Sequence, residues 1–371
     1  VQVKNPNNND TQVTELVLYR EGDNTFTFEK GSVFNGSQEH ATIKGVDNLL
    51  RITPDNIFAD DLDVKILKSA VTSSLAGIST RTIGFAQLTS SNRVVGVGTT
   101  VQITANTLDK IESYFAAVEI QDNVTKEKNF VELFVTHDGT NSYISQYYAD
   151  SGITSSISGN FIGTFTSDIS SNILSFSHSN DSSNEVNVRS RIVGFGTTAV
   201  GVGTHYFNNA GQTAGTERSA RYESKYFNIT NSNASSSYGN SVGIDTSIFT
   251  SVKSIVRVSC GTTSALHQTL MMFDGVDTYL SHYPFVSIGT TTGIGTFITS
   301  RSGGKTFLKF KPDAAFNGSN IEVQQFDELI YTESDRFNTS PDLIYGNASD
   351  SVSLVSYNAI NGTRSTKTEF D

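Results

Sequence analysis

Two stretches of the chain carry the same pattern of residues. Residues 131–148 (VELFVTHDGTNSYISQYY) and 267–284 (HQTLMMFDGVDTYLSHYP) each run from an alternating apolar segment through Asp-Gly into a second alternating segment that contains tyrosine. Asp-Gly between two such segments is a strong hairpin signal, because tight hairpin turns need positive φ angles that glycine adopts without strain. The sequence therefore predicts two related β-hairpins, with turns at Asp138-Gly139 and Asp274-Gly275.

The repetition continues beyond these hairpins. Matching segments follow in the same order: 117–120 with 255–258, 174–176 with 308–310, and 186–188 with 321–323. Each copy spans roughly 100 residues, the usual size of one β-sandwich domain. Chance similarity between two β-rich stretches is the alternative, and the conserved order of hairpin, turn and later strands argues against it. We expect an all-β fold: an N-terminal β region followed by two tandem, related β-sandwich or jelly-roll modules.

The predicted organisation has four parts: an N-terminal docking β region (1–80), a first module (81–190), a second module (191–336) with a polar insertion near 208–245, and a C-terminal polar tail (337–371). Within the insertion we expect one strand, 220–230, and within the tail another, 351–360. Residues 59–71 fit either a strand or a short helix, and 106–115 fit a short helix. Polar tails of this kind often order only against a partner.

Charge argues against a nucleic-acid partner, and the lengths of the apolar runs argue against membrane insertion. The chain has 371 residues and a formal net charge of −11, and no basic stripe occurs in it. Binding to nucleic acid needs clustered Lys and Arg, so no nucleic-acid partner is expected. No apolar run approaches the ~20 residues that span a bilayer, so no membrane insertion is expected. Cys260 is the single cysteine, which precludes an intramolecular disulfide and indicates a buried free thiol.

No motif for catalysis or for a cofactor is complete. Residues 194–201 lack the G-x-G-x-x-G spacing, and Gly304-Lys305-Thr306 lacks the earlier glycine of a phosphate loop, because Thr299 occupies that position. The six histidines show no metal-ligand spacing, and His137 is expected at the surface. We therefore expect no cofactor, no catalytic residue and no enzymatic activity. A polysaccharide-degrading enzyme stays open as an alternative, because its paired carboxylates meet only in the fold.

Two small sets of residues are weak site candidates. Asp60, Asp61 and Asp63 form the densest acidic cluster and could hold Ca²⁺, but the D-x-D-x-D-G loop pattern is absent and a solvated turn is the alternative. Tyr147 and Tyr283 follow the two hairpin turns and could stack on sugar rings of a host-surface glycan. They alternate with apolar residues, which favours a place in the core instead.

Three glycine-rich phrases carry a family resemblance. Val95–Thr100, Gly194–Thr204 and Ile288–Thr296 alternate Gly with Val, Ile or Phe and end in Thr, within a chain that is rich in Ser, Thr and Asn and lacks Trp. These phrases resemble structural proteins of tailed phages that infect marine cyanobacteria. The resemblance implies a virion component of the tail, baseplate, fibre or capsid surface, assembled in the host cytoplasm and in contact with other virion proteins. It implies a homo-oligomer, with a trimer expected for a fibrous part, and it assigns no functional residue.

Overall fold

The protein is built almost entirely of β-strands. The computed structural model describes residues 1–5, 10–21, 24–35, 41–46, 49–54, 62–71, 77–83, 85–150, 162–197, 202–208, 218–239, 243–247, 249–274, 276–289, 293–331, 343–345, 350–359 and 365–369. In these residues the only helical segment is a 3₁₀ turn, η1 (Ala314–Phe316), and every sheet pairing is antiparallel. The predicted all-β class is confirmed.

The first sandwich lies in the middle of the chain. Its larger sheet has the order β12-β11-β10-β15-β8-β7, and its smaller sheet has the order β13-β14-β9. The strands are β7 (Gly77–Ile83), β8 (Ala86–Val95), β9 (Thr100–Thr107), β10 (Ile111–Asp122), β11 (Lys128–His137), β12 (Ser142–Asp150), β13 (Thr164–Ser170), β14 (Ile173–Ser179) and β15 (Val186–Gly196). Alternation in β10 directs Tyr114, Ala116 and Val118 into the core between the two sheets.

The second sandwich follows directly. Its larger sheet has the order β16-β17-β25-β20-β21-β22, and β18, β19 and β23 all pair with β24 in the smaller sheet. The strands are β16 (Val202–Asn208), β17 (Arg218–Ile229), β18 (Tyr238–Gly239), β19 (Ile244–Asp245), β20 (Phe249–Cys260), β21 (Thr263–Phe273), β22 (Thr278–Ile288), β23 (Gly295–Ser302), β24 (Lys305–Pro312) and β25 (Ile321–Tyr331). Cys260 is half-buried against this core as a free thiol.

A third sandwich joins the two ends of the chain. Its larger sheet has the order β26-β27-β6-β1-β2-β3, and its smaller sheet has the order β28-β5-β4. The strands are β1 (Gln2–Lys4), β2 (Thr11–Glu21), β3 (Asn24–Phe34), β4 (Ala41–Val46), β5 (Leu49–Pro54), β6 (Leu62–Val71), β26 (Leu343–Tyr345), β27 (Asp350–Ala359) and β28 (Ser365–Glu369). Strands from the C-terminal segment thus complete a sheet that begins at the N-terminus.

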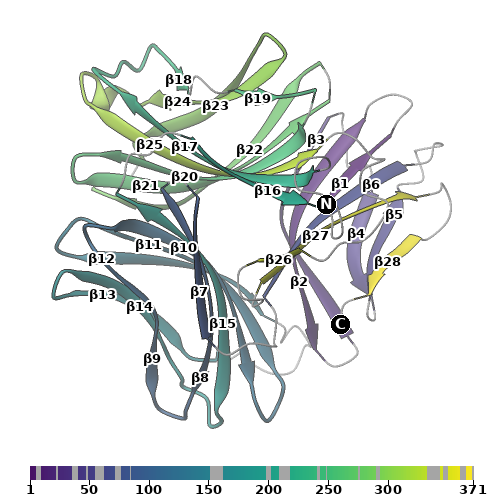
Figure 1. The fold of residues 1–371 in the computed structure, drawn as a ribbon, viewed down its shortest axis with the longest axis vertical. Helices are drawn as coiled ribbons and strands as arrows, with labels where there is room; N and C mark the ends of the chain where they lie inside the picture. Colours follow the sequence, from purple (N-terminus) through teal and green to yellow (C-terminus); the bar gives the residue numbers. More distant parts are fainter. Residues whose placement is uncertain are drawn as a thin grey trace.

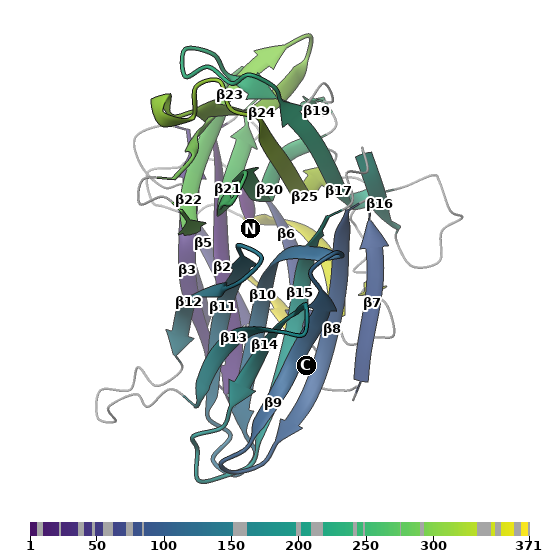
Figure 2. The same ribbon diagram turned by 90° about the vertical axis from the view of Figure 1, so that its left-hand side faces the viewer.

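The three larger sheets share one strand order. Each order is written from one edge strand: β12 in the first sandwich, β22 in the second and β3 in the third. The orders are then β12-β11-β10-β15-β8-β7, β22-β21-β20-β25-β17-β16 and β3-β2-β1-β6-β27-β26. In the third sheet the last two strands come from the other end of the chain, so its order is a circular permutation of the other two. Figure 1 shows the three sandwiches around a common centre, with the small sheets on the outside, and Figure 2 shows the same arrangement from the side.

The repeated hairpins have the predicted turns. β11 pairs with β12 and β21 with β22. Oδ1 of Asp138 accepts hydrogen bonds from the backbone N–H groups two and three residues later, at 2.9 and 2.7 Å, and Oδ1 of Asp274 does the same at 2.8 and 2.6 Å. In both hairpins a tyrosine hydroxyl, from Tyr143 or Tyr279, donates to the other carboxylate oxygen. Gly139 has a φ of 93°, which explains the glycine that follows the aspartate.

Three segments need comment against the sequence. Residues 62–71 form strand β6, which decides between the strand and the helix considered for 59–71. The short helix expected over 106–115 is wrong: β9 ends at Thr107, a turn follows, and β10 begins at Ile111, because Ile111 is needed in the sandwich core. The polar stretches also contain the long strands β17 and β27, as expected for 220–230 and 351–360.

Two predicted domain boundaries, at 80/81 and 190/191, fall inside β7 and β15.

Buried charges fill the place where the three larger sheets meet. Glu15 on β2 and Lys30 on β3 belong to the third sandwich, Glu132 on β11 to the first, and Lys253 on β20 to the second. Lys30 Nζ lies 2.9 Å from Glu15 and 2.6 Å from Glu132, and Lys253 Nζ lies 2.7 Å from Glu15. Each of these side chains is at most 21% exposed. We call this group, with its neighbours Arg191, Gln268 and Glu328, the charge junction.

The charge junction is electrically balanced. Arg191 of the first sandwich lies 3.1 Å from Glu328 of the second, which also lies 4.0 Å from Lys253. The junction thus holds three cations and three carboxylates. Burial opposes ionisation of Glu15, but the charges of Lys253 and Lys30 outweigh it and lower the pKa of Glu15 to about 2. Burial likewise opposes the charge on Lys253, but the carboxylates of Glu15, Glu328 and Glu132 together outweigh it and raise the pKa of Lys253.

A β-bulge delivers Lys30 to the junction. Glu15 pairs with Gly31 and Leu16 pairs with Glu29, so Lys30 is the additional residue on β3. A bulge re-aims a side chain that regular pairing would direct elsewhere. Apolar clusters then seal the contacts between the larger sheets: Phe115, Phe134 and Phe195 meet Ile255 and Phe326 between the first and second sandwiches.

Removing Lys253 tests the energetic role of the charge junction. Lys253→Met leaves Glu15 short of one cation in a buried site, so we expect the free energy of unfolding to fall by about 3 kcal/mol. In Lys253→Met/Glu15→Gln both partners are neutral, and the total loss should be smaller than the sum of the single losses. Urea unfolding measures all three, with Lys311→Met on an exposed part of β24 as the control. Strictly additive losses would contradict the coupling.

Engineered cysteines test the closure of the third sandwich. Lys65 on β6 pairs with Ser356 on β27, and antiparallel partners have Cα atoms about 4.5–5.5 Å apart, within disulfide range. In a Cys260→Ser background, Lys65→Cys/Ser356→Cys should oxidise to a crosslinked chain with altered mobility on a denaturing gel without reductant. Lys68→Cys/Ser356→Cys, three residues out of register, should not. Equal crosslinking of both pairs, or of neither, contradicts the pairing.

Candidate functional site

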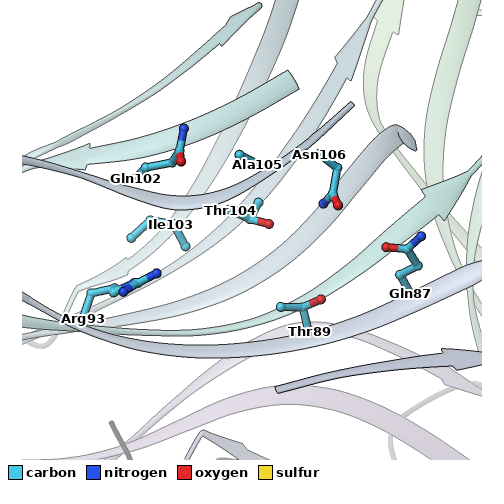
Figure 3. Close-up of a pocket in the computed structure, with 8 residues that line it drawn as sticks. All are labelled: Gln87, Thr89, Arg93, Gln102, Ile103, Thr104, Ala105 and Asn106. Atoms are coloured by element: carbon cyan, nitrogen blue, oxygen red, sulfur yellow. The ribbon is translucent and has the colours of Figure 1, made fainter. Parts of the chain in front are cut away.

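A polar cleft opens between β8 and β9, at one edge of the first sandwich. Its cavity volume is about 230 Å³. It is lined by Gln87, Thr89, Arg93, Gln102, Ile103, Thr104, Ala105 and Asn106. Figure 3 shows Arg93 at one end and Gln87 with Asn106 at the other, facing each other from the two strands. The volume is below the roughly 300–1,000 Å³ of clefts that hold drug-sized ligands, so it suits a single small polar group.

The cleft exists because β8 carries polar residues on its inner face. Arg93 pairs with Val188 and Thr89 with Ile192, and both partners belong to the core of the first sandwich. Gln87, Thr89 and Arg93 therefore point between the two sheets, where side chains are normally apolar. The alternate residue Leu88 packs instead against the second sandwich. Polar side chains at an inner edge keep the two sheets from closing over each other.

One end of the cleft is held by a buried tyrosine. Asn106 Nδ2 donates to the hydroxyl of Tyr114 at 2.9 Å. Burial raises the pKa of Tyr114 to about 12, against the opposing effect of hydrogen bonds with Asn106 and Thr104, so this hydroxyl stays neutral. None of the eight lining residues is a carboxylate, histidine or cysteine. The lining can bind a polar ligand but holds no pair of groups for acid–base chemistry.

A second surface feature lies at one end of the first sandwich. Val94, Val97 and Val124 are 59%, 55% and 70% exposed, and we call them the valine tip. They lie at the end of β8, in the β8–β9 turn and in the β10–β11 turn. Asp122 holds the turns together from beneath, accepting hydrogen bonds from the backbone of Val124 at 2.7 Å and from the hydroxyl of Ser182 at 2.9 Å.

Hydrogen bonds to the carboxylate of Asp122 hold the turns of the valine tip in place. Burial opposes its charge, but four surrounding donors outweigh that effect and lower the pKa of Asp122 to about 2. Asn180 adds hydrogen bonds from its side chain to the backbone carbonyls of Val95 and Gly96, at 3.0 and 3.2 Å. Exposed apolar side chains on a fixed support are typical of protein contact sites.

The two candidate sugar-stacking tyrosines lie away from the cleft. Tyr147 is 44% exposed and its ring meets Phe134 edge-on, with 6.2 Å between ring centroids. Tyr283 is half-buried and packs against the backbone of Gly31 on the third sandwich, where an added Cβ would lie 1.6 Å from its hydroxyl. Both rings therefore take part in contacts between β-strands, and their binding of glycans stays a prediction.

The metal candidates and most histidines yield no site. Asp60 and Asp61 lie outside the described residues, and Asp63 is placed only by its backbone, in β6. Where the structure describes the chain, no three His, Cys, Asp or Glu side chains gather as metal ligands. The same residues contain no helix that is long and apolar enough to cross a bilayer. His137 was expected at the surface, but its side chain is 7% exposed, because its ring bonds the carbonyl of Ile111 and the N–H of Gly139.

Sequence reasoning missed a pair of histidines inside the second sandwich. Nδ1 of His267 lies 2.9 Å from Nε2 of His282, and Phe297 meets both rings edge-on. His267 is 2% exposed. Burial, with a smaller effect from His282, lowers the pKa of His267 to about 3. The residues lie on paired strands, β21 and β22, so cross-strand counting from the Asp274 turn was the signal that could have brought them together.

Comparison with protein-family models, with curated proteins and with solved structures gave no match.

His267 predicts a pH dependence of stability. Its folded-state pKa lies below the ordinary 6.5, so the unfolded chain binds the proton first. The contribution to stability is complete above pH 6.5 and is lost as pH falls toward 3, by at most about 1.4 kcal/mol per pH unit. His267→Leu should flatten urea midpoints between pH 6 and pH 4, with pH 8 as the reference for any packing change. An unchanged slope would contradict the assignment.

Proposed function

We propose that this protein is a non-enzymatic structural component of a tailed-phage virion, associated with the tail, baseplate or fibre, and that it acts through assembly contacts. The observation that carries the proposal is the closed three-sandwich body. One chain joins its own ends through β6 and β27 and buries its larger sheets against one another. Shared apolar clusters fix the sandwiches against one another, which suits a part that works through assembly contacts.

The glycine-rich phrases supply the link to virions. They resemble those of structural proteins from phages of marine cyanobacteria, and one of them, Val95–Thr100, forms the turn that carries Val97 of the valine tip. The valine tip is thus an exposed apolar contact surface built partly from such a phrase. We assign to it the contact with a neighbouring virion protein. A homotrimer is the assembly we propose for a fibrous part, which native mass distinguishes from a single 40.1 kDa chain.

Incorporation into particles tests both the role and the contact. In the phage that encodes the chain, we expect purified particles to contain the protein at a fixed ratio to the major capsid protein, measured by quantitative mass spectrometry. Val97→Asp/Val124→Asp should reduce incorporation several-fold without lowering the melting temperature, because a charge on each turn opposes desolvation at the contact. Val276→Asp, at a side chain 76% exposed in the second sandwich, is the matched control.

Two outcomes would contradict these assignments. Abundant protein in infected cells with none in particles would overturn the virion role. Normal incorporation of the double variant would leave the role standing but remove the valine tip from the contact.

A further inference from the structure

Arg93 is a half-buried cation on β8. Its Nε is shielded from solvent and donates to no acceptor among the described residues, and no ion pair to its guanidinium is formed within them. Arg189 in the same sheet has an equally shielded Nε, but its guanidinium forms an ion pair with Glu119. A buried, unsatisfied donor on a charged group costs stability, so an unpaired arginine lining a cleft points to a missing ligand.

The second sandwich shows that the scaffold does not require arginine here. Arg93 pairs with Val188 on β15, and the residue in the same place of the second sandwich is Phe227, which pairs with Val323 on β25. Phe227 packs against the apolar core of its sandwich. At the same structural position, one copy closes the edge with an aromatic ring and the other opens a polar cleft around a cation. The sandwich scaffold therefore accommodates an aromatic side chain at this position and does not need arginine to close its edge.

The remaining lining selects the kind of anion. Gln87, Gln102 and Asn106 carry amides, and Thr89 and Thr104 carry hydroxyls, so the wall both donates and accepts hydrogen bonds. Inorganic phosphate is mainly an acceptor and carries at most two O–H donors at neutral pH, so it would leave several amide and hydroxyl oxygens of the wall without a donor. Sugar hydroxyls both donate and accept, and one carboxylate on the ring would match the planar guanidinium with two parallel hydrogen bonds.

The edge of β9 adds backbone groups to the same wall. In the described part of the chain β9 pairs only with β14, so its other edge carries N–H and C=O groups along Gln102–Asn106. Figure 3 shows these residues opposite β8 across the opening. Gln102 and Ala105 are exposed at the rim, so a chain of sugars can continue into solvent from one bound residue.

We propose that the β8–β9 cleft binds one acidic sugar residue of a polysaccharide, a uronate, with Arg93 pairing with its carboxylate and the amides and hydroxyls of the wall bonding its ring hydroxyls. This site is independent of the virion role, because it rests on the cleft alone. It is also distinct from the candidate tyrosines, which lie on β12 and β22.

Calorimetric titration of the full chain with a galacturonate trimer tests the site, with the neutral galactose trimer as the matched ligand. We expect the acidic trimer to bind and the neutral trimer to bind at least about tenfold more weakly, because only the acidic one forms the charged pair. Arg93→Gln should weaken binding of the acidic trimer by about tenfold to a hundredfold. Arg93→Lys should lose part of the affinity, since lysine cannot form the bidentate pair.

The controls separate binding from folding. Arg93→Gln and Arg93→Phe should not lower the melting temperature, since each removes an unpaired charge and the second installs the side chain found in the other sandwich. Lys311→Gln, a surface cation on β24, should leave binding unchanged.

Four results would overturn the proposal. They are equal binding of the acidic and neutral trimers, unaltered binding by Arg93→Gln, a large drop in melting temperature in that variant, or no binding of the acidic trimer at millimolar concentration. Competition by inorganic phosphate as effective as that of galacturonate monomer would reassign the cleft to a simple anion and equally overturn it.

Discussion

The arrangement of the three sandwiches depends on ion pairs at the charge junction. Ion pairs join the larger sheets: Lys30 of the third sandwich pairs with Glu132 of the first as well as with Glu15 of its own sheet, and Lys253 of the second pairs with Glu15 of the third. Separating the sheets would break the pairs that cross between them, and breaking a buried ion pair is costly. Apolar contacts between sheets tolerate small shifts, whereas these pairs require one position of each sheet.

The sheet that carries Glu15 and Lys30 also contains strands from the other end of the chain. Glu15 and Lys30 lie on β2 and β3, in a sheet that is complete only when β27 pairs with β6. The backbone nitrogen of Val1 donates to the carbonyl of Thr14 at 2.7 Å, which ties the start of β1 to β2. Pairing of β27 with β6 thus completes the sheet against which the other two sandwiches pack.

Local patterns were readable where the physical cause is local. The hairpin turns at Asp138 and Asp274 follow from an aspartate that accepts nearby backbone N–H groups, helped at the first turn by Gly139, and the structure has both hairpins. Strand β27 was also expected, but its pairing with β6 was not. The sequence of one strand does not specify which distant strand it will pair with. The helix expected near Leu108 failed since two apolar residues three apart fit a turn between strands equally well.

Alternation and turn chemistry in the amino-acid order were enough to predict an all-β chain with repeated hairpins, and the net charge of −11 was read from composition alone. They act over a few residues, so they can be read without the fold. The direction in which Arg93 faces, the bulge that places Lys30 and the meeting of His267 with His282 arise only when strands pair and sheets stack. Period-two alternation defines two faces of a strand, but packing alone decides which face becomes core, cleft or junction.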